Sequence, residues 1–240
     1  MVRTLDAAAA WVDDVGLALL FPKADVVLPS LWSRVAGDAG APTAVREPDG
    51  TFVRWADGMG FLWNAKDELP ARGLVCVGKH LARVTACVAP RVLPALVAQA
   101  DRSAPDGLES ELVSAVRSLG PLTGGALRAA VGATKSEVDR GIAALHRRLV
   151  LTSSHLVEQE VGWGALAHDL LDRKWKLPER LPPVDEARRE LARLVLAAAG
   201  ELTAADLSGV LGWRRRLAAD VLDEVAPARV DGDFRIWAAP

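Results

Sequence analysis

Two stretches of the chain carry nearly the same order of apolar and polar positions, about 80 residues apart. Apolar residues recur in both at three- and four-residue spacing, which predicts amphipathic helices. The matching positions are Gly120-Pro121-Leu122-Thr123 with Gly200-Glu201-Leu202-Thr203, Leu127 with Leu207, and Val131-Gly132 with Leu211-Gly212. The chain therefore contains one helical unit twice.

In the first copy, the pattern predicts helices over 109–119, 123–131 and 135–149, a β-ribbon from strands 150–154 and 156–161, and a further helix over 164–176. Thr123 and Thr134 are suitable N-cap residues, and Gly132 is suitable for ending a helix. Two helices joined by a turn and followed by a β-ribbon are typical of a winged-helix unit, which makes nucleic acid the first partner to consider.

The second copy has the clearer signals. Its predicted helices cover 186–199, 203–211 and 213–225, and its closing ribbon joins 228–230 to 234–237. Asp231-Gly232 between alternating residues is a strong hairpin signal. This copy predicts a C-terminal winged helix.

The first hundred residues mix helical and extended patterns. Predicted helices cover 4–20, 30–36 and 91–99, with a helix or turn over 60–69, and β-prone stretches are 51–55, 74–77 and 83–88. Residues 25–29 are predicted as an extended link. Residues 37–50 contain Gly and Pro but little apolar content, and are predicted as a loop.

The predicted fold class is α+β, mostly α, with tandem winged-helix units behind an N-terminal mixed α/β region. The predicted regions are 1–100, a first winged-helix-like unit over 108–176, and a C-terminal winged helix over 185–240. Polar and Pro-bearing linkers at 101–107 and 178–183 separate them.

Composition narrows the function classes. Half of the residues are apolar and a quarter are charged, as in a soluble globular protein. No apolar run approaches the roughly 20 residues of a membrane-spanning helix, and no signal-peptide pattern is present, so a cytoplasmic location without membrane partners is expected. The two cysteines and four histidines form no metal-ligand motif, and neither a metal nor another cofactor is expected.

Arginines at the start of the last helix are the main nucleic-acid candidates. Arg214, Arg215 and Arg216 fall where a helix–turn–helix protein contacts DNA. Weaker candidates are Lys135, Arg140, Arg147 and Arg148 on the third helix of the first copy, with Lys66 and Lys79 in the first hundred residues. Two alternatives stay open. The arginines could pair with Asp220, Asp223 and Glu224, and the formal charge of −2 favours a winged-helix module that binds a protein partner.

Catalytic candidates lie in the first hundred residues. Trp55 and Trp63 could stack on an exposed base, and Asp67 and Glu68 could orient water. Lys66, Lys79, His80 and Arg83 lie close by in the sequence. The alternative is a core role for the tryptophans and a plain polar helix for the carboxylates. Phosphate-binding loops, GxGxxG and GxSxG motifs are absent from the sequence, which gives no support to kinase, dehydrogenase or classical hydrolase functions.

Three further segments resemble the AlkZ-like DNA glycosylase family, in particular its shorter AlkZ-related bacterial proteins. They are residues 11–22 (WVDDVGLALLFP), 28–37 (LPSLWSRVAG), and 63–70 (WNAKDELP) followed by Gly78-Lys79. The resemblance implies tandem winged helices around a cleft of DNA size, double-stranded DNA as the partner, and metal-free excision of alkylated or crosslinked bases.

The sequence departs from the family pattern at the catalytic motif. The resemblance implies a glutamine pair, or a glutamine and an aspartate two residues apart, that places the attacking water in the N-terminal region. The only glutamines are Gln99 and Gln159, and residues 19–22 contain none. Gln99-Ala100-Asp101 matches the letters, but it ends a predicted helix next to a linker, so we interpret it as a coincidence. A DNA-binding protein and a divergent glycosylase both remain as hypotheses.

Overall fold

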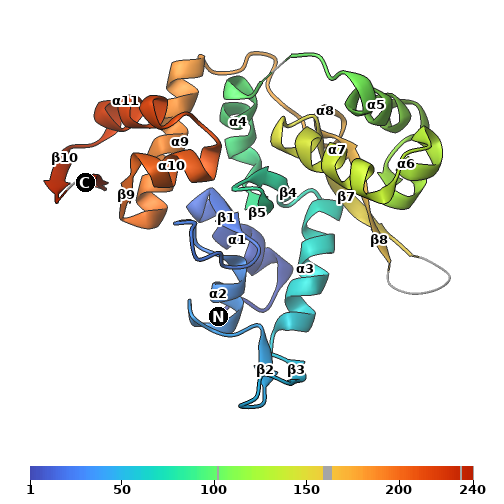
Figure 1. Cartoon of the computed structure of the whole chain (residues 1–240), viewed down its shortest axis with the longest axis horizontal. Helices are drawn as coiled ribbons and strands as arrows, with labels where there is room; N and C mark the ends of the chain where they lie inside the picture. Colours follow the sequence, from blue (N-terminus) through green and yellow to red (C-terminus); the bar gives the residue numbers. More distant parts are fainter. Residues whose placement is uncertain (102, 159–163, 233, 240) are drawn as a thin grey trace.

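One order of elements occurs three times in the described residues: a helix, a short strand, two helices and a β-hairpin (Figure 1). The computed structural model describes residues 1–101, 103–158, 164–232 and 234–239. The fold of these residues is α+β, with about half of the chain helical and the strands in small antiparallel sheets. In each repeat, the short strand pairs with the second strand of the hairpin.

The C-terminal segment has the repeat in its simplest form. Its elements are α9 (Val184–Ala199), β9 (Glu201–Thr203), α10 (Ala204–Leu211), α11 (Arg215–Val225), β10 (Ala228–Asp231) and β11 (Phe234–Ala238). The strand order is β10-β11-β9. Thr203 caps α10 in a capping box with Asp206, which fixes the start of that helix. The three helices and the hairpin predicted here from the sequence are confirmed.

The central segment has the same order. Its elements are α5 (Gly107–Leu119), β6 (Leu122–Thr123), α6 (Gly124–Val131), α7 (Lys135–Arg147), β7 (Leu151–Val157), β8 (Ala165–Leu170) and α8 (Leu171–Lys174). Thr123 and Thr134 are the N-caps of α6 and α7, as predicted, and Gly132 ends α6 in the left-handed conformation.

The prediction for residues 150–176 is wrong in two places. Residues 151–157 form one strand, and its hairpin partner is β8, which occupies most of the predicted helix 164–176. The end of the predicted ribbon strand, 159–161, lies outside the described residues. A short apolar run does not distinguish a strand from a helix by periodicity, and here pairing with both β6 and β7 decides the outcome.

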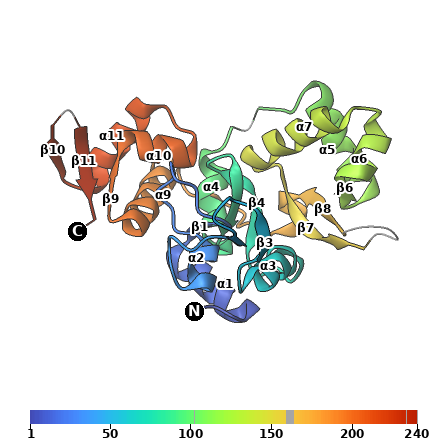
Figure 2. The same cartoon turned by 60° about the horizontal axis from the view of Figure 1, so that its bottom comes forward.

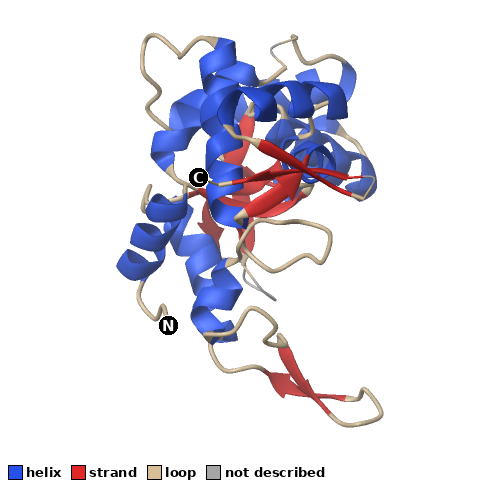
Figure 3. Cartoon of the chain, turned by 90° about the vertical axis from the view of Figure 1, so that its left-hand side faces the viewer, coloured by secondary structure: helices blue, strands red, loops and turns tan. Residues whose placement is uncertain are grey.

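The N-terminal segment has the same order with two insertions. Its elements are α1 (Leu5–Val15), β1 (Leu17–Leu19), α2 (Leu31–Ala36), β2 (Ala44–Arg46), β3 (Phe52–Trp55), α3 (Met59–Ala71), β4 (Cys76–Leu81), β5 (Val84–Val88), the 3-10 helix η1 (Pro90–Val92) and α4 (Leu93–Gln99). The main sheet has the order β1-β5-β4. The β2–β3 hairpin is inserted between α2 and α3 and projects from the body of the molecule (Figure 3).

Two predictions in this segment are corrected. The predicted helix 4–20 ends at Val15, because Gly16 takes a positive φ of 76° and residues 17–19 become a fully buried strand against β5. The predicted loop 37–50 contains β2, which pairs with β3. The helices predicted over 30–36 and 91–99 are confirmed, and the alternative of a helix or turn over 60–69 is resolved as a helix.

The hydrophobic core has two parts. Side chains of the N-terminal and C-terminal segments share one cluster, in which helices α4 and α9 pack together. The central segment has its own cluster, which includes Leu112, Leu127 and Leu145. Figure 2 shows the N-terminal segment between the two outer ones. Leu149, Leu171 and Trp175 at the end of the central segment reach into the first cluster, so the central segment joins the rest partly through that shared cluster.

Leu127 and Leu207 test this division, because they are equivalent in the repeat and both fully buried. Each change to alanine should lower the free energy of unfolding by about 2–5 kcal/mol. Leu127→Ala should speed amide hydrogen exchange in the central segment alone, and Leu207→Ala in both other segments. Exchange measured by mass spectrometry distinguishes them, and an equal spread of both effects over the whole chain would contradict two cores.

Candidate nucleic-acid interface

The β4–β5 hairpin lies where all three segments meet. Its two-residue turn consists of Ala82 and Arg83, which have φ values of 48° and 58°. Two positive φ values match the twist of a tight hairpin, but they are costly for residues other than Gly and Asn. The backbone N–H of Ala82 donates to the carbonyl of Val210 on α10 at 2.9 Å. The turn is therefore held by the C-terminal segment, and the exposed Arg83 is presented at its tip.

Three hollows lie along this hairpin, and residues of the hairpin line each of them. The first, of about 460 Å³, lies between α3, β4, α7 and the β7–β8 hairpin, and we call it the base-sized cleft. The second, of about 360 Å³, lies beside Phe21 and Lys23, and the third, of about 560 Å³, reaches Trp213. The first and second hollows share Lys79 and Thr85, and the second and third share Arg83. Together they form one surface, the hairpin groove.

The hairpin groove is positively charged in a chain with a net charge of −2. Its lining includes five cations and one carboxylate: Lys23, Lys66, Lys79, Arg83 and Arg147, with Asp139. Lys23 pairs with Asp25, and Lys66 with Asp67. Among the described residues, no ion pair involves Lys79, Arg83 or Arg147. Such unpaired cations in a concave surface attract polyanions.

One wall of the base-sized cleft is aromatic. Trp63 on α3 is 44% exposed, meets the ring of Phe21 edge-on at 5.8 Å, and lies 5.7 Å from the Lys66 ammonium. Trp63 and Lys66 are three residues apart, so they share one face of the helix. The other candidate, Trp55, lies on β3 against Phe52, outside the residues that line the groove.

Three histidines that are scattered in the sequence meet behind this cleft. His80 and His146 are stacked with ring centroids 5.2 Å apart, and the His146 and His168 rings meet edge-on at 5.1 Å. His80 Nδ1 donates to the carbonyl of His146 at 2.7 Å, and the backbone N–H of Lys79 donates to His146 Nδ1 at 3.1 Å. These bonds join the hairpin to α7.

The histidines are neutral at ordinary pH. Burial lowers the pKa of His80 to about 4, and burial together with Lys79 lowers the pKa of His168 to about 4, although Asp139 acts in the opposite direction. Burial, followed by repulsion from His80, His168 and Lys79, holds the pKa of His146 well below its ordinary value. Burial outweighs the opposing effect of Asp139 on His168, so the cluster contributes hydrogen bonds rather than charge.

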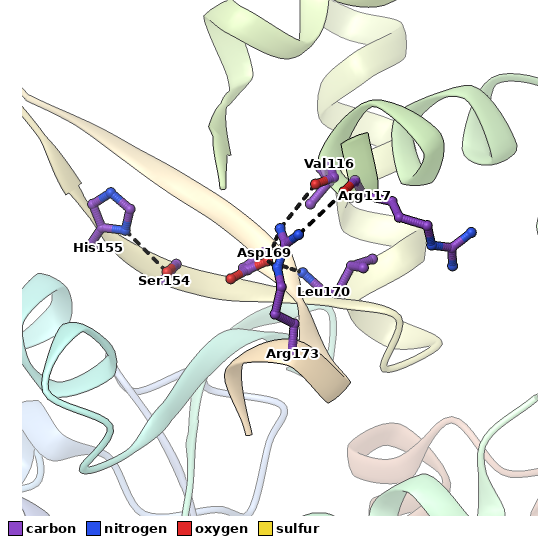
Figure 4. Close-up of polar contacts among 7 residues, drawn as sticks. All are labelled: Val116, Arg117, Ser154, His155, Asp169, Leu170 and Arg173. Atoms are coloured by element: carbon purple, nitrogen blue, oxygen red, sulfur yellow. Dashed lines mark hydrogen bonds and ion pairs between the residues drawn. The ribbon is translucent and has the colours of Figure 1, made fainter. Parts of the chain in front are cut away.

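The predicted carboxylates do not line the groove. Asp67 pairs with its neighbour Lys66, and Glu68 pairs with Arg72 at 2.9 Å along α3. Asp169 follows His168 in the sequence, but its buried side chain accepts from Leu170 N and from Arg173, which in turn donates to the carbonyl of Val116 (Figure 4). Asp139 is the acidic residue of the groove, and the sequence analysis did not single it out, because nothing near it in the sequence indicates a site.

The predicted arginine cluster begins α11. Arg214, Arg215 and Arg216 are exposed and follow Trp213, which lines the hairpin groove. Two of the carboxylates considered as their partners are bound elsewhere: Asp223 to Arg235, and Glu224 to Arg189. No ion pair in the described part of the chain includes the three arginines.

The cations predicted on α7 lie in different places. Arg147 lines the hairpin groove and also a second hollow that it shares with Arg140 and Glu137, whereas Arg140 lines only that second hollow among those described. Lys135 is exposed at the first residue of α7. Arg148 is half-buried, and its guanidinium binds Glu109 at 2.5 Å and the Ser103 carbonyl. Arg148 thereby ties the start of α5 to the end of α7.

Gln99 has a structural contact. Its side-chain oxygen accepts from the indole N–H of Trp213 at 2.7 Å, and Asp101 accepts from the backbone N–H of Ser103. The interpretation of Gln99-Ala100-Asp101 as a coincidence stays a prediction. In the described residues no group of His, Cys, Asp and Glu could hold a metal ion, and no helix is long and apolar enough to cross a membrane.

A family model described as DNA glycosylase AlkZ-like matches residues 59–240. The chain belongs to the AlkZ-like DNA glycosylase family, which links it to DNA binding and DNA repair. The match includes the base-sized cleft, the central and C-terminal segments, and the resembling segment 63–70. The other two resembling segments, within 11–37, precede it. No curated protein and no solved structure matches the chain.

Gly78 tests whether the histidine cluster shapes the cleft. A Cβ atom there would lie 2.5 Å from both His146 Nδ1 and His80 Nε2. Gly78→Ala should therefore cost about 1–3 kcal/mol of unfolding free energy by overpacking. Gly60→Ala on α3 is the control, because its Cβ meets nothing within 4 Å, and it should stabilise by about 0.5–1 kcal/mol. Denaturant unfolding measures both, and equal effects would contradict the tight packing at Gly78.

Proposed function

We propose that the chain is a DNA-binding protein of the AlkZ-like family in which the hairpin groove holds double-stranded DNA. The observation that carries this proposal is the charge of the groove, five cations against one carboxylate in a chain of net charge −2. Phosphate contacts supply most of the affinity of proteins for DNA, and unpaired Lys79, Arg83 and Arg147 suit this role. A cytoplasmic location remains a prediction.

The repeated topology supports this function. We infer that the central and C-terminal segments are winged-helix units and that the N-terminal segment is a third one, because each has the order helix, strand, helix, helix, hairpin. The third helices would be α7 and α11, the position that contacts DNA in helix–turn–helix proteins. Arg214, Arg215 and Arg216 at the start of α11 continue the positive charge of the groove beyond Trp213.

A protein partner is the weaker alternative. It was favoured by the neutral charge of the whole chain, but the local charge of the groove favours a polyanion instead. The exposed apolar residues concentrate on the projecting β2–β3 hairpin, at Phe52, Val53 and Trp55, away from the groove residues. A partner protein at that hairpin would be compatible with DNA in the groove.

Removal of the groove cations should weaken DNA binding and its salt dependence together. The logarithm of the association constant falls linearly with the logarithm of the salt concentration, and each phosphate contact contributes about 0.9 to the steepness of this fall. We expect the triple change Lys79→Ala, Arg83→Ala and Arg147→Ala to reduce the steepness by roughly 2–3. Arg214/Arg215/Arg216→Ala should act in the same way. Fluorescence anisotropy with an unmodified duplex measures both.

The control has the same change of charge outside the groove. Lys176, Arg180 and Arg193 are exposed and line none of its three hollows. Their triple change to alanine should leave the salt slope within experimental error of the unchanged protein. Binding that is absent, insensitive to salt, or equally reduced by the control would contradict the proposed groove.

A second candidate function is catalysis, as a divergent DNA glycosylase. The specific observation is the base-sized cleft, which places an exposed tryptophan and a carboxylate, Trp63 and Asp139, around one hollow. A glycosylase must extrude a base and orient water for hydrolysis of its N-glycosidic bond. The sequence predicted Asp67 and Glu68 for the second task, whereas the position in the cleft favours Asp139.

Base release separates these carboxylates. With a duplex containing one N7-methylguanine, Asp139→Asn should slow release by about 10²–10⁴-fold if Asp139 orients the water. Asp67→Asn and Glu68→Gln should then have little effect, and the reverse pattern would support the roles predicted from the sequence. No release by the unchanged protein, measured by chromatography of the free base, would reject glycosylase activity on this lesion and leave DNA binding as the function.

A further inference from the structure

The histidine cluster forms a chain of hydrogen bonds with a fixed direction. The backbone N–H of Lys79 can only donate, so His146 Nδ1, 3.1 Å away, must accept. A neutral His146 therefore has its proton on Nε2. That nitrogen lies 3.1 Å from His168 Nδ1 and donates to it.

The consequence is one defined tautomer of His168, the last residue of this series of hydrogen bonds. Because His168 Nδ1 accepts, its ring proton is on Nε2. His168 lines the base-sized cleft, and among the described residues no hydrogen bond involves its Nε2. A donor of fixed identity is thus available on the side of the ring away from His146.

His80 lies beside this series of hydrogen bonds, and buried contacts fix the protonation of its own ring. His80 Nδ1 must donate to the carbonyl of His146, because a carbonyl only accepts. His80 Nε2 then accepts, with Cys76 Sγ at 3.4 Å as the nearby donor, because the Thr152 hydroxyl donates to the carbonyl of Val77. Burial raises the pKa of Cys76 to about 12, which keeps the thiol protonated as a donor.

We propose that His168 is a specificity-determining residue, whose Nε2–H donates to an acceptor atom of a nucleobase in the base-sized cleft beside Trp63. This inference rests on DNA binding in the hairpin groove. The ligand class follows from the lining: an exposed aromatic face for stacking, a neutral donor, and the ammonium groups of Lys66 and Lys79. The bond from His146 makes His168 a donor at all times, so it discriminates against a base that presents a donor at that position.

The tautomer is the first test, and it needs no DNA. Long-range ¹H–¹⁵N correlation spectra of the full chain, labelled at histidine, should show His168 as the neutral Nε2–H tautomer near pH 7. A neutral Nδ1–H form or a charged ring at His168 would overturn the proposal.

The second test uses two duplexes that differ only in the base. One contains a single N7-methylguanine and the other a tetrahydrofuran abasic site at the same position. The unchanged protein should bind the first more tightly, and His168→Leu should reduce this preference by roughly three- to tenfold, the range of one neutral hydrogen bond. His168→Gln, which keeps an N–H donor, should restore part of it, and His155→Leu is the matched control.

These outcomes separate the inference from the proposed function. Loss of binding to an unmodified duplex in the unchanged protein would reject the groove. Normal binding without a preference between the two duplexes, or a preference that His168→Leu leaves intact, would reject His168 as the donor. The titratable groups that line the cleft with His168 are Lys66, Lys79, Asp139 and His146. Burial and Lys79 lower the pKa of His168 to about 4, although Asp139 raises it. The preference between the two duplexes should therefore be constant from about pH 8 to about pH 5.5.

Discussion

The arrangement of the three segments depends on hydrogen bonds made by one hairpin. Strands β4 and β5 belong to the N-terminal segment, but their polar groups bind both neighbours. Ala82 N donates to the C-terminal segment at Val210, while Lys79 N and His80 Nδ1 donate to His146 of the central segment. The central segment has its own hydrophobic cluster and adds Leu149, Leu171 and Trp175 to the shared one, and the polar contacts at the hairpin act with these apolar contacts to fix its position. Such bonds are directional, and they set the shape of the groove more narrowly than apolar packing does.

The same contacts explain the chemistry of the groove. The imidazoles are buried and neutral, and they lock the backbone of the hairpin without adding charge. The cations stand on exposed positions of the same hairpin and of α7, where water solvates them. Strain at the Ala82–Arg83 turn is tolerated because α10 holds it, and strained turns of this kind occur where a side chain must be presented to a ligand.

Local signals allowed good prediction where local interactions decide the structure. The threonine caps at Thr123 and Thr134 identify two helix starts without tertiary information, and Asp231-Gly232 identifies a hairpin, although Asp231 itself ends strand β10. The third repeat stayed hidden because a long link separates β1 from α2 and a hairpin separates α2 from α3, so the spacing of the other copies is lost. β1 and β8 were assigned to helices because only pairing with distant strands distinguishes them.

The site was harder to predict than the fold. Trp63, Lys66 and Lys79 were identified from residue type, and all three line the cleft. Asp139, His146 and His168 were not, because nothing in their neighbourhood in the sequence indicates that α7 and β8 face α3. The chemistry of the cleft arises from tertiary packing across more than 100 residues, from Trp63 to His168.

The central claim is that DNA lies along the β4–β5 hairpin. Hydrogen–deuterium exchange with and without an unmodified duplex tests it directly. The account predicts slower exchange at the hairpin turn, on the facing side of α7 and at the start of α11, with no change in α9 or in the β2–β3 hairpin. Protection that spares the β4–β5 turn and appears on the β2–β3 hairpin would contradict the account.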